Sequence, residues 1–289
     1  CQRQGKTYDS KHHREDKRIS KDQRENVEII GTFNNVFNPH QYSFEERKGL
    51  YDNLYEIFNK NPRLFPNHSE FLKKFNTLKQ NVNVAIVGKY TNLSESYKSL
   101  NEALFHSGIF NNTRVKISWI DSRKIKDFNK TQKTLKNFQG ILVPGGFGKE
   151  GTSGKINAIK FAKTFNIPFL GICFGMQLAI IESLRNLKGY EKSSSTEFGK
   201  TDFPVISMMH EWEKGKKIHK QDLDNLGGSM RLGSYESILK KNTLVFKIYK
   251  KTKIYERHRH RYEVNYNYLK PIVSSGITLS GMSPNKKLV

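Results

Sequence analysis

Apolar and polar residues follow two alternating periods from residue 82 onward. Residues 82–88 alternate and then run apolar up to a glycine, as a strand buried on both faces does. Residues 94–108 begin with a capping serine, continue at helical spacing and end in glycine. By the same criteria we expect strands at 115–120, 140–144 and 168–172, and helices at 156–165 and 174–187. Strands that alternate with helices predict an α/β fold, a mostly parallel sheet flanked by helices with functional residues at the carboxyl ends of its strands.

The first 80 residues lack this alternation. Residues 1–45 begin with a highly charged run that is poor in apolar residues and cannot bury enough surface to offset the entropy cost of ordering. Residues 46–80 carry apolar residues at helical spacing, interrupted at Asn61-Pro62 and Phe65-Pro66. We therefore expect a disordered charged tail or linker over 1–45, a helical linker over 46–80 and one α/β domain over 81–289.

The chain is strongly basic, with 50 Lys and Arg against 27 Asp and Glu among its 289 residues. A net charge of +23 favours polyanionic partners. Lysine and asparagine are nevertheless abundant along the whole chain, as a compositional bias alone would produce, and no aromatic-interleaved basic motif or zinc-finger spacing accompanies them. We therefore expect a solvated, lysine-rich surface and no nucleic-acid partner.

The chain has only two cysteines, Cys1 and Cys173, which excludes a disulfide framework and favours a reducing compartment. No apolar run approaches the length of a membrane span, and no secretory signal is recognisable at the start. The histidines and acidic residues form no short-spaced set of the zinc type. The prediction is a cytoplasmic protein with no membrane partner and no metal site.

A cysteine lies between two glycines where a predicted strand meets a predicted helix. The sequence Gly171-Ile-Cys173-Phe-Gly175 has the form of a nucleophile elbow, in which small flanking residues allow a sharp turn that exposes the nucleophile. The helix amino terminus is expected to lower the pKa of the thiol, and the amide of Phe174 to point at a developing oxyanion. A second glycine-rich turn, PGGFG at 144–148, ends the neighbouring predicted strand and offers another amide. A lone cysteine is more often a small buried hydrophobe, but two such turns together favour a nucleophile.

These two turns resemble those of the class I, triad-type glutamine amidotransferases. Further segments resemble the glutaminase half of CTP synthases: VGKY at 87–90, YKS at 97–99, STEF at 195–198, LGGSMRLG at 226–233 and ERHRHRYEVN at 256–265. The resemblance covers residues 70–289 and implies a flavodoxin-like glutamine amidotransferase domain. It also implies a ligase activity of pyrimidine biosynthesis, in which glutamine is hydrolysed through a cysteinyl thioester and its ammonia aminates UTP to CTP at the expense of ATP.

The resemblance assigns roles to eight residues. Cys173 is then the nucleophile. The α-carboxylate of glutamine requires a guanidinium partner, and its α-ammonium group requires a carboxylate partner. The expected glutamine-binding residues are Gly146 and Phe174 for the oxyanion, Gly175, Met176 and Gln177 along the pocket, and Glu197 and Arg261 at the amino-acid end.

The sequence departs from the family at its end. The family completes its triad with a His-Pro-Glu segment, yet beyond Glu263 the chain has no His, Asp or Glu. Residues 276–284 resemble the family just upstream of that segment, so we expect a truncated chain that binds glutamine weakly and turns it over little or not at all. His258 and His260 alternate with arginines along a predicted strand, and we expect them on its opposite face, in a structural or interdomain role.

A second departure concerns nucleotide activation. The family usually has an arginine and a glutamate after PGGFG that are linked to activation by GTP, whereas this chain has Glu150 and Ser153 there. A carboxylate repels anionic groups, which argues against GTP as an activator. The basic stretch 213–220 is expected to be a solvated loop. ATP and Mg would belong to a synthetase domain outside this chain, and no cofactor is expected in the chain itself.

The expected partners are glutamine, the synthetase domain and further copies of the enzyme in a tetramer. Two other functions remain open at the level of the sequence. One is a class I amidotransferase with a different ammonia acceptor, and the other is a non-catalytic assembly module of the same fold.

Overall fold

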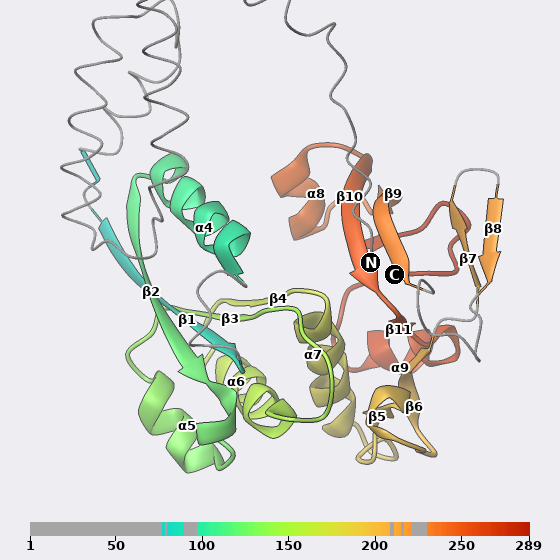
Figure 1. Cartoon of the computed structure of the whole chain (residues 1–289), viewed down its shortest axis with the longest axis horizontal. Helices are drawn as coiled ribbons and strands as arrows, with labels where there is room; N and C mark the ends of the chain where they lie inside the picture. The colour runs from blue at the N-terminus through green and yellow to red at the C-terminus, as the bar shows by residue number, and fades with distance from the viewer. Residues whose placement is uncertain (1–76, 79, 90–96, 209–210, 215–216, 221–229) are drawn as a thin grey trace, which may run out of the picture. The chain divides into compact units, whose positions relative to one another are not determined.

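The computed structural model describes residues 77–78, 80–89, 97–208, 211–214, 217–220 and 230–289 (Figure 1). The chain divides into two compact units, Cys1–Thr77 and Leu78–Val289, and nearly all described residues belong to the second. The tail predicted over 1–45 lies outside the described residues, as does almost all of the linker predicted over 46–80.

A four-stranded parallel sheet forms the first half of the second unit. Its strands lie in the order β2-β1-β3-β4, and β1 pairs with both β2 and β3. Residues 85–87 in β1 are fully buried, which explains why their stretch of sequence reads as continuously apolar. The predicted parallel sheet is therefore confirmed, with strands β1 (Gln80–Gly88), β2 (Thr113–Asp121), β3 (Gly140–Val143) and β4 (Phe169–Gly171).

Helices flank this sheet on both sides. Helix α4 (Lys98–Phe110) lies on one side, and α5 (Phe128–Leu135), α6 (Thr152–Thr164) and α7 (Phe174–Arg185) lie on the other (Figure 1). The sequence did not predict α5, whose only large apolar residues are Phe128 and Leu135. It forms because Asp127 caps its first turn by accepting from the amide of Lys130 at 2.9 Å and because Leu135 is fully buried.

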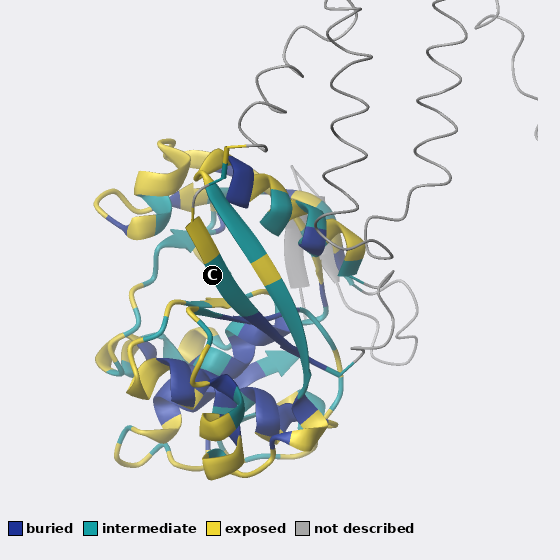
Figure 2. Ribbon diagram, turned by 90° about the vertical axis from the view of Figure 1, so that its left-hand side faces the viewer, coloured by how far each residue is buried: buried dark blue, intermediate teal, exposed yellow. Residues whose placement is uncertain are grey.

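Most of the hydrophobic core lies between the sheet and the helices of the second side. Figure 2 shows the buried residues gathered in that lower part of the molecule. The apolar faces of α6 and α7 contribute Ala158, Phe161, Leu178 and Ile181, each at most 3 % exposed. Burying such a side chain contributes about 1.5–3 kcal/mol, so this layer holds the carboxyl ends of β3 and β4 in place.

Two smaller sheets and a hairpin make up the second half. Strands β9, β10 and β12 form an antiparallel sheet, and β7 pairs with β8. Strands β11, β6 and β5 form a mixed sheet, in which β6 is antiparallel to β11 and parallel to β5. The bounds are β5 (Ser194–Ser195), β6 (Pro204–Met208), β7 (Glu211–Lys214), β8 (Lys217–Lys220), β9 (Arg231–Leu239), β10 (Lys253–His260), β11 (Tyr262–Val264) and β12 (Gly281–Met282). Short helices complete this half: η5 (Thr196–Phe198), α8 (Leu244–Tyr249), η6 (Tyr266–Tyr268) and α9 (Leu269–Ser274). A further short helix, η4 (Ser122–Lys124), follows β2 in the first half.

Two sequence predictions are wrong in this half. The solvated loop expected over 213–220 is mostly strand, because the segments on either side of residues 215–216 pair as β7 and β8. The predicted strand on which His258 and His260 alternate with arginines does not include Arg261, because β10 ends at His260 and β11 begins at Tyr262 in a different sheet. Arg261 lies at the break between them, a position that periodicity cannot reveal because it depends on which sheet each half joins.

Candidate active site

The two glycine-rich turns predicted from the sequence lie side by side. Val143 at the end of β3 is paired in register with Gly171 at the end of β4, and the amide of Ile172 donates to the Val143 carbonyl at 3.0 Å. A Cβ atom on Gly145 would lie 3.7 Å from the Cβ of Cys173. The PGGFG turn, which we call the oxyanion loop (residues 144–148), therefore runs directly beside the cysteine.

Cys173 lies on a tight elbow before α7. Its φ of 53° and ψ of −105° belong to a region that residues other than glycine rarely occupy. A Cβ on Gly171 would lie 2.7 Å from the Gly175 carbonyl carbon, and a Cβ on Gly175 would lie 2.0 Å from the Val143 oxygen. No side chain fits at either flank, so these glycines are required by the close approach of the backbone.

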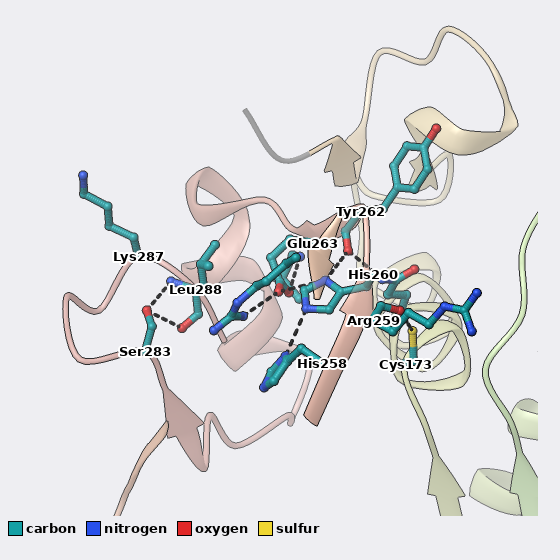
Figure 3. Close-up of polar contacts among 12 residues, drawn as sticks. Cys173, His258, Arg259, His260, Tyr262, Glu263, Ser283, Lys287 and Leu288 are labelled. Atoms are coloured by element: carbon teal, nitrogen blue, oxygen red, sulfur yellow. Dashed lines mark hydrogen bonds and ion pairs between the residues drawn. The ribbon is translucent and has the colours of Figure 1, made fainter. Parts of the chain in front are cut away.

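Burial sets the acidity of the thiol. The Sγ atom lies 3.8 Å from the Arg259 carbonyl oxygen on β10 (Figure 3). Burial raises the pKa of Cys173 above its ordinary value, and the carboxylates of Glu263 and Glu197 raise it further. The amide of Phe174 donates toward the sulfur and lowers the pKa by less. The lowered pKa expected from the helix amino terminus is therefore wrong, because desolvation outweighs it.

The pH dependence of alkylation at Cys173 follows from this environment. Iodoacetamide reacts with the thiolate, so a raised pKa shifts the rate profile to higher pH. We expect the rate at Cys173, followed by mass spectrometry, to keep rising at a pH where a cysteine in a short unstructured peptide has levelled off. A rate at Cys173 that levels off at a lower pH than the rate of the peptide would contradict the inferred dominance of burial.

Two side chains, those of Lys89 and Glu197, bind the backbone at the carboxyl end of the oxyanion loop. The Lys89 Nζ, directly after β1, donates to the Phe147 carbonyl at 2.7 Å. The Gly148 amide donates to the Glu197 Oε1 at 2.6 Å. These bonds come from two different elements, β1 and η5, so tertiary structure shapes the loop.

Glu197 and Arg261 interact electrostatically, and their joint contact with glutamine stays a prediction. Glu197 lies in η5, which Ser195 caps by accepting from the Glu197 amide at 3.1 Å. Burial raises the pKa of Glu197, while the Gly148 amide and the charges of Lys89, Lys155 and Arg261 oppose the rise. Because Glu197 also acts on the pKa of Cys173, the carboxylate, the guanidinium and the thiol share one electrostatic environment.

Comparison with known proteins agrees with this geometry. The family described as Glutamine amidotransferase class-I matches residues 92–289. The chain belongs to the class-I glutamine amidotransferase family. This confirms both the family and the fold class predicted from the sequence.

Relatives within the family are CTP synthases. The chain is 46 % identical over 255 residues to CTP synthase from Parvibaculum lavamentivorans, covering 86 % of this chain and 46 % of that protein. It is 54 % identical over 211 residues to CTP synthase from Pelagibacter ubique, covering 73 % of this chain and 39 % of that protein. The chain thus spans less than half the length of these relatives.

A solved structure gives the same result. The chain superposes on the glutaminase domain of Trypanosoma brucei CTPS with bound acivicin, with a TM-score of 0.61 and 34 % sequence identity. The match covers 70 % of this chain and 75 % of that one. Within the class-I amidotransferases, the chain therefore groups with the glutaminase domains of CTP synthases.

The three residues that the amidotransferase resemblance places along the glutamine pocket contact mainly the interior of the protein. The Gly175 amide donates to the Ile172 carbonyl at 2.9 Å, and Met176 packs against the core. The Gln177 side chain is buried, and its Nε2 donates to the Tyr262 carbonyl at 2.9 Å. Their contact with glutamine stays a prediction, whereas their contribution to the elbow and to the position of β11 is direct.

The two histidines form a short chain of contacts next to the site (Figure 3). The Nδ1 of His260 lies 3.0 Å from the Tyr262 carbonyl, which can only accept, so this nitrogen carries the proton. The His260 Nε2 then accepts from the Nδ1 of His258 at 3.0 Å. Burial lowers the pKa of both, that of His258 to about 4, so both rings are neutral at pH 7. Their side chains lie on one face of β10, as predicted, with contacts suited to a structural role.

Sequence reasoning did not single out two buried charged residues near the site. Glu263 is 5 % exposed, lies 3.9 Å from the Arg231 guanidinium, and has its pKa raised to about 7 by burial. Lys155 on α6 is 1 % exposed. One signal was available for Lys155: it stands on the same helical face as Ala158, Ile159 and Ala162, which are apolar and buried.

The part of the chain that the structure describes contains neither a metal-ligand cluster nor a membrane-spanning helix. None of its His, Cys, Asp and Glu side chains gather in threes as a metal ion requires. Every helix there is too short or too polar to cross a bilayer.

Proposed function

We propose that this chain is the glutamine-hydrolysing part of a CTP synthase, which releases ammonia for the ATP-dependent amination of UTP to CTP. One observation carries the proposal: a strained cysteine elbow, a glycine-rich oxyanion loop and Glu197 converge from β4, β3 and η5, and Glu197 contacts that loop and interacts electrostatically with Arg261. A protein that used this fold only for assembly would have no need of that convergence.

The geometry supports a thioester mechanism. The Cys173 sulfur attacks the amide carbon of glutamine, and the electron pair of the C=O double bond moves to the oxygen. The amides of Gly146 and Phe174 donate to this oxyanion, and ammonia leaves with a proton as the double bond reforms. Water then hydrolyses the thioester through a second oxyanion. Proton transfer from the thiol requires a base, which the family supplies from a His-Pro-Glu segment that this sequence does not contain.

The remaining partners are proposed from the resemblance to CTP synthases. The ammonia acceptor would be a synthetase domain that holds ATP, Mg and UTP, and the full enzyme would be a cytoplasmic homotetramer. GTP activation is not part of the proposal, because Glu150 stands at the family's arginine position. It is exposed, and its Oε1 lies 3.4 Å from the Arg123 guanidinium.

Replacing Arg261 by glutamine is expected to weaken glutamine binding about ten- to hundredfold, because one charged hydrogen-bond donor to the α-carboxylate is lost. Calorimetric titration of the chain with glutamine measures this effect. Arg257→Gln, which removes an exposed arginine from the same strand segment, is the matched control and should leave the affinity unchanged.

A ligand control separates recognition of the carboxylate from damage to the fold. 4-Aminobutanamide is glutamine without its α-carboxylate, and it should bind the unmodified chain and Arg261→Gln with equal affinity. Equal affinity of the two proteins for glutamine itself would contradict the role proposed for Arg261.

A further inference from the structure

The position of Lys155 is costly for the fold alone. Its side chain is 1 % exposed, and moving an ammonium group out of water costs several kcal/mol. It also stands in the first turn of α6, where the helix dipole disfavours a positive charge. Among the described residues no carboxylate forms an ion pair with it. Helix formation and core packing therefore give no reason for a lysine here.

The contacts of Lys155 point instead to the oxyanion loop and the elbow. Its Nζ would lie 3.3 Å from a Cβ placed on Gly146, so the ammonium group occupies the space that a side chain there would take. The same atom lies 4.8 Å from the centre of the Phe174 ring. Gly146 and Phe174 are the two residues whose amides the proposed mechanism uses for the oxyanion, and Lys155 contacts both.

The charges around Lys155 come from two other elements. Glu197 in η5 attracts the ammonium group and Lys89 after β1 repels it, while burial has the largest effect. Together they lower the pKa of Lys155 to about 8. The group is therefore mostly charged at pH 7 and loses its charge as the pH rises through 8.

We propose that Lys155 is a positioning residue whose buried ammonium group raises the positive potential of the oxyanion hole from behind Gly146 and Phe174. A charge held in a water-poor site acts more strongly than one in water, and it costs no reorganisation when the oxyanion forms. Lys155 does not touch the substrate. It stabilises the tetrahedral state more than bound glutamine, because only that state carries negative charge on the oxygen. This inference rests on the function proposed above.

The test compares two ligands on one variant, Lys155→Met, which keeps the length of the side chain and removes its charge. One ligand is glutamine, and the other is its γ-aldehyde analogue, glutamate γ-semialdehyde. The Cys173 thiolate adds to the aldehyde carbon after the thiol proton has passed to water, and the electron pair of the C=O double bond moves to the oxygen, giving a tetrahedral hemithioacetal whose oxyanion lies in the hole. We expect Lys155→Met to bind the aldehyde about tenfold more weakly and glutamine with nearly unchanged affinity.

Two controls sharpen the comparison. Lys160→Met removes another lysine of α6 that lies over a phenylalanine ring, 4.9 Å from the centre of Phe128, but is exposed. It should affect neither ligand. The ratio of the aldehyde affinities of the unmodified chain and Lys155→Met should also approach one as the pH rises through 8. The titration of Cys173 cancels in this ratio because both proteins contain Cys173.

Each outcome decides the matter. Equal aldehyde binding by the unmodified chain and Lys155→Met would overturn the inference and leave the proposed function intact. A parallel loss of both ligands would show a purely structural lysine and overturn it as well. If the unmodified chain forms no adduct at Cys173, the proposed function and the inference fail together.

Discussion

A chloroketone analogue of glutamine is expected to alkylate Cys173 about 100-fold faster than Cys1, because binding of its amino-acid end by Glu197 and Arg261 holds the electrophile beside the sulfur. Mass spectrometry of the labelled peptides measures the ratio. Cys173→Ala should abolish the fast phase, and Cys1→Ser should leave it unchanged. Excess glutamine should slow the reaction at Cys173 alone.

The same substitution has a large expected effect in an enzyme that carries this domain together with its synthetase domain. There, Cys173→Ala should abolish CTP formation from glutamine while CTP formation from added ammonium salt continues, because only the source of ammonia is lost. The two assays differ in nothing but the nitrogen donor. Loss of both activities would show that Cys173 supports the fold and not glutamine hydrolysis, and survival of both would exclude it as the nucleophile.

Gly175→Ala is expected to destabilise the domain by about 3 kcal/mol and to abolish fast labelling of Cys173. The added Cβ would lie 2.0 Å from the Val143 oxygen, which is backbone in the middle of the buried layer and cannot move aside as a flexible side chain would. Relief of this contact requires α7 to shift away from β3, and the elbow shifts with it. Urea unfolding measures the stability.

Gly140→Ala is the matched control for this substitution. A Cβ on Gly140 at the start of β3 would meet only the Cγ2 of Val84, at an ordinary distance of 3.5 Å. Its stability should stay within about 0.5 kcal/mol of the unmodified chain, and its labelling should be normal. If Gly175→Ala is as stable and as reactive as Gly140→Ala, the close packing of the elbow against β3 is not what positions Cys173.

Much of the fold could be predicted because burial on both faces leaves a continuous apolar signal. This signal marks β1 and β3, whereas β2 and β4 were predicted although they are less buried, and α6 and α7 were predicted from their helical spacing. Helix α5 was missed because only two large apolar residues mark its buried side. The rest of its stabilisation comes from the cap at Asp127. The break at Arg261 was missed because both halves of that segment have strand character, and only their partners in two sheets separate them.

The candidate site was predicted where the chemistry is local and missed where it depends on distant segments. The elbow and the oxyanion loop each occupy five successive residues, and their glycines are visible in the sequence. The elbow glycines are required by close backbone contact, and Gly148 in the loop has a positive φ of 78°. Lys155 was not singled out because a lysine in a lysine-rich chain is ordinarily a solvated residue. Its burial appears only once α6 packs against the oxyanion loop and Phe174.

The sequence by itself determined the alternation of strands and helices, the nucleophile elbow and the family, since each depends on residues close together in the chain. Tertiary structure alone decided the acidity of Cys173, the electrostatic interaction of Glu197 with Arg261 and the surroundings of Lys155. The physical reason is that desolvation and Coulomb interactions depend on distance in space, and residues far apart along the chain set them here.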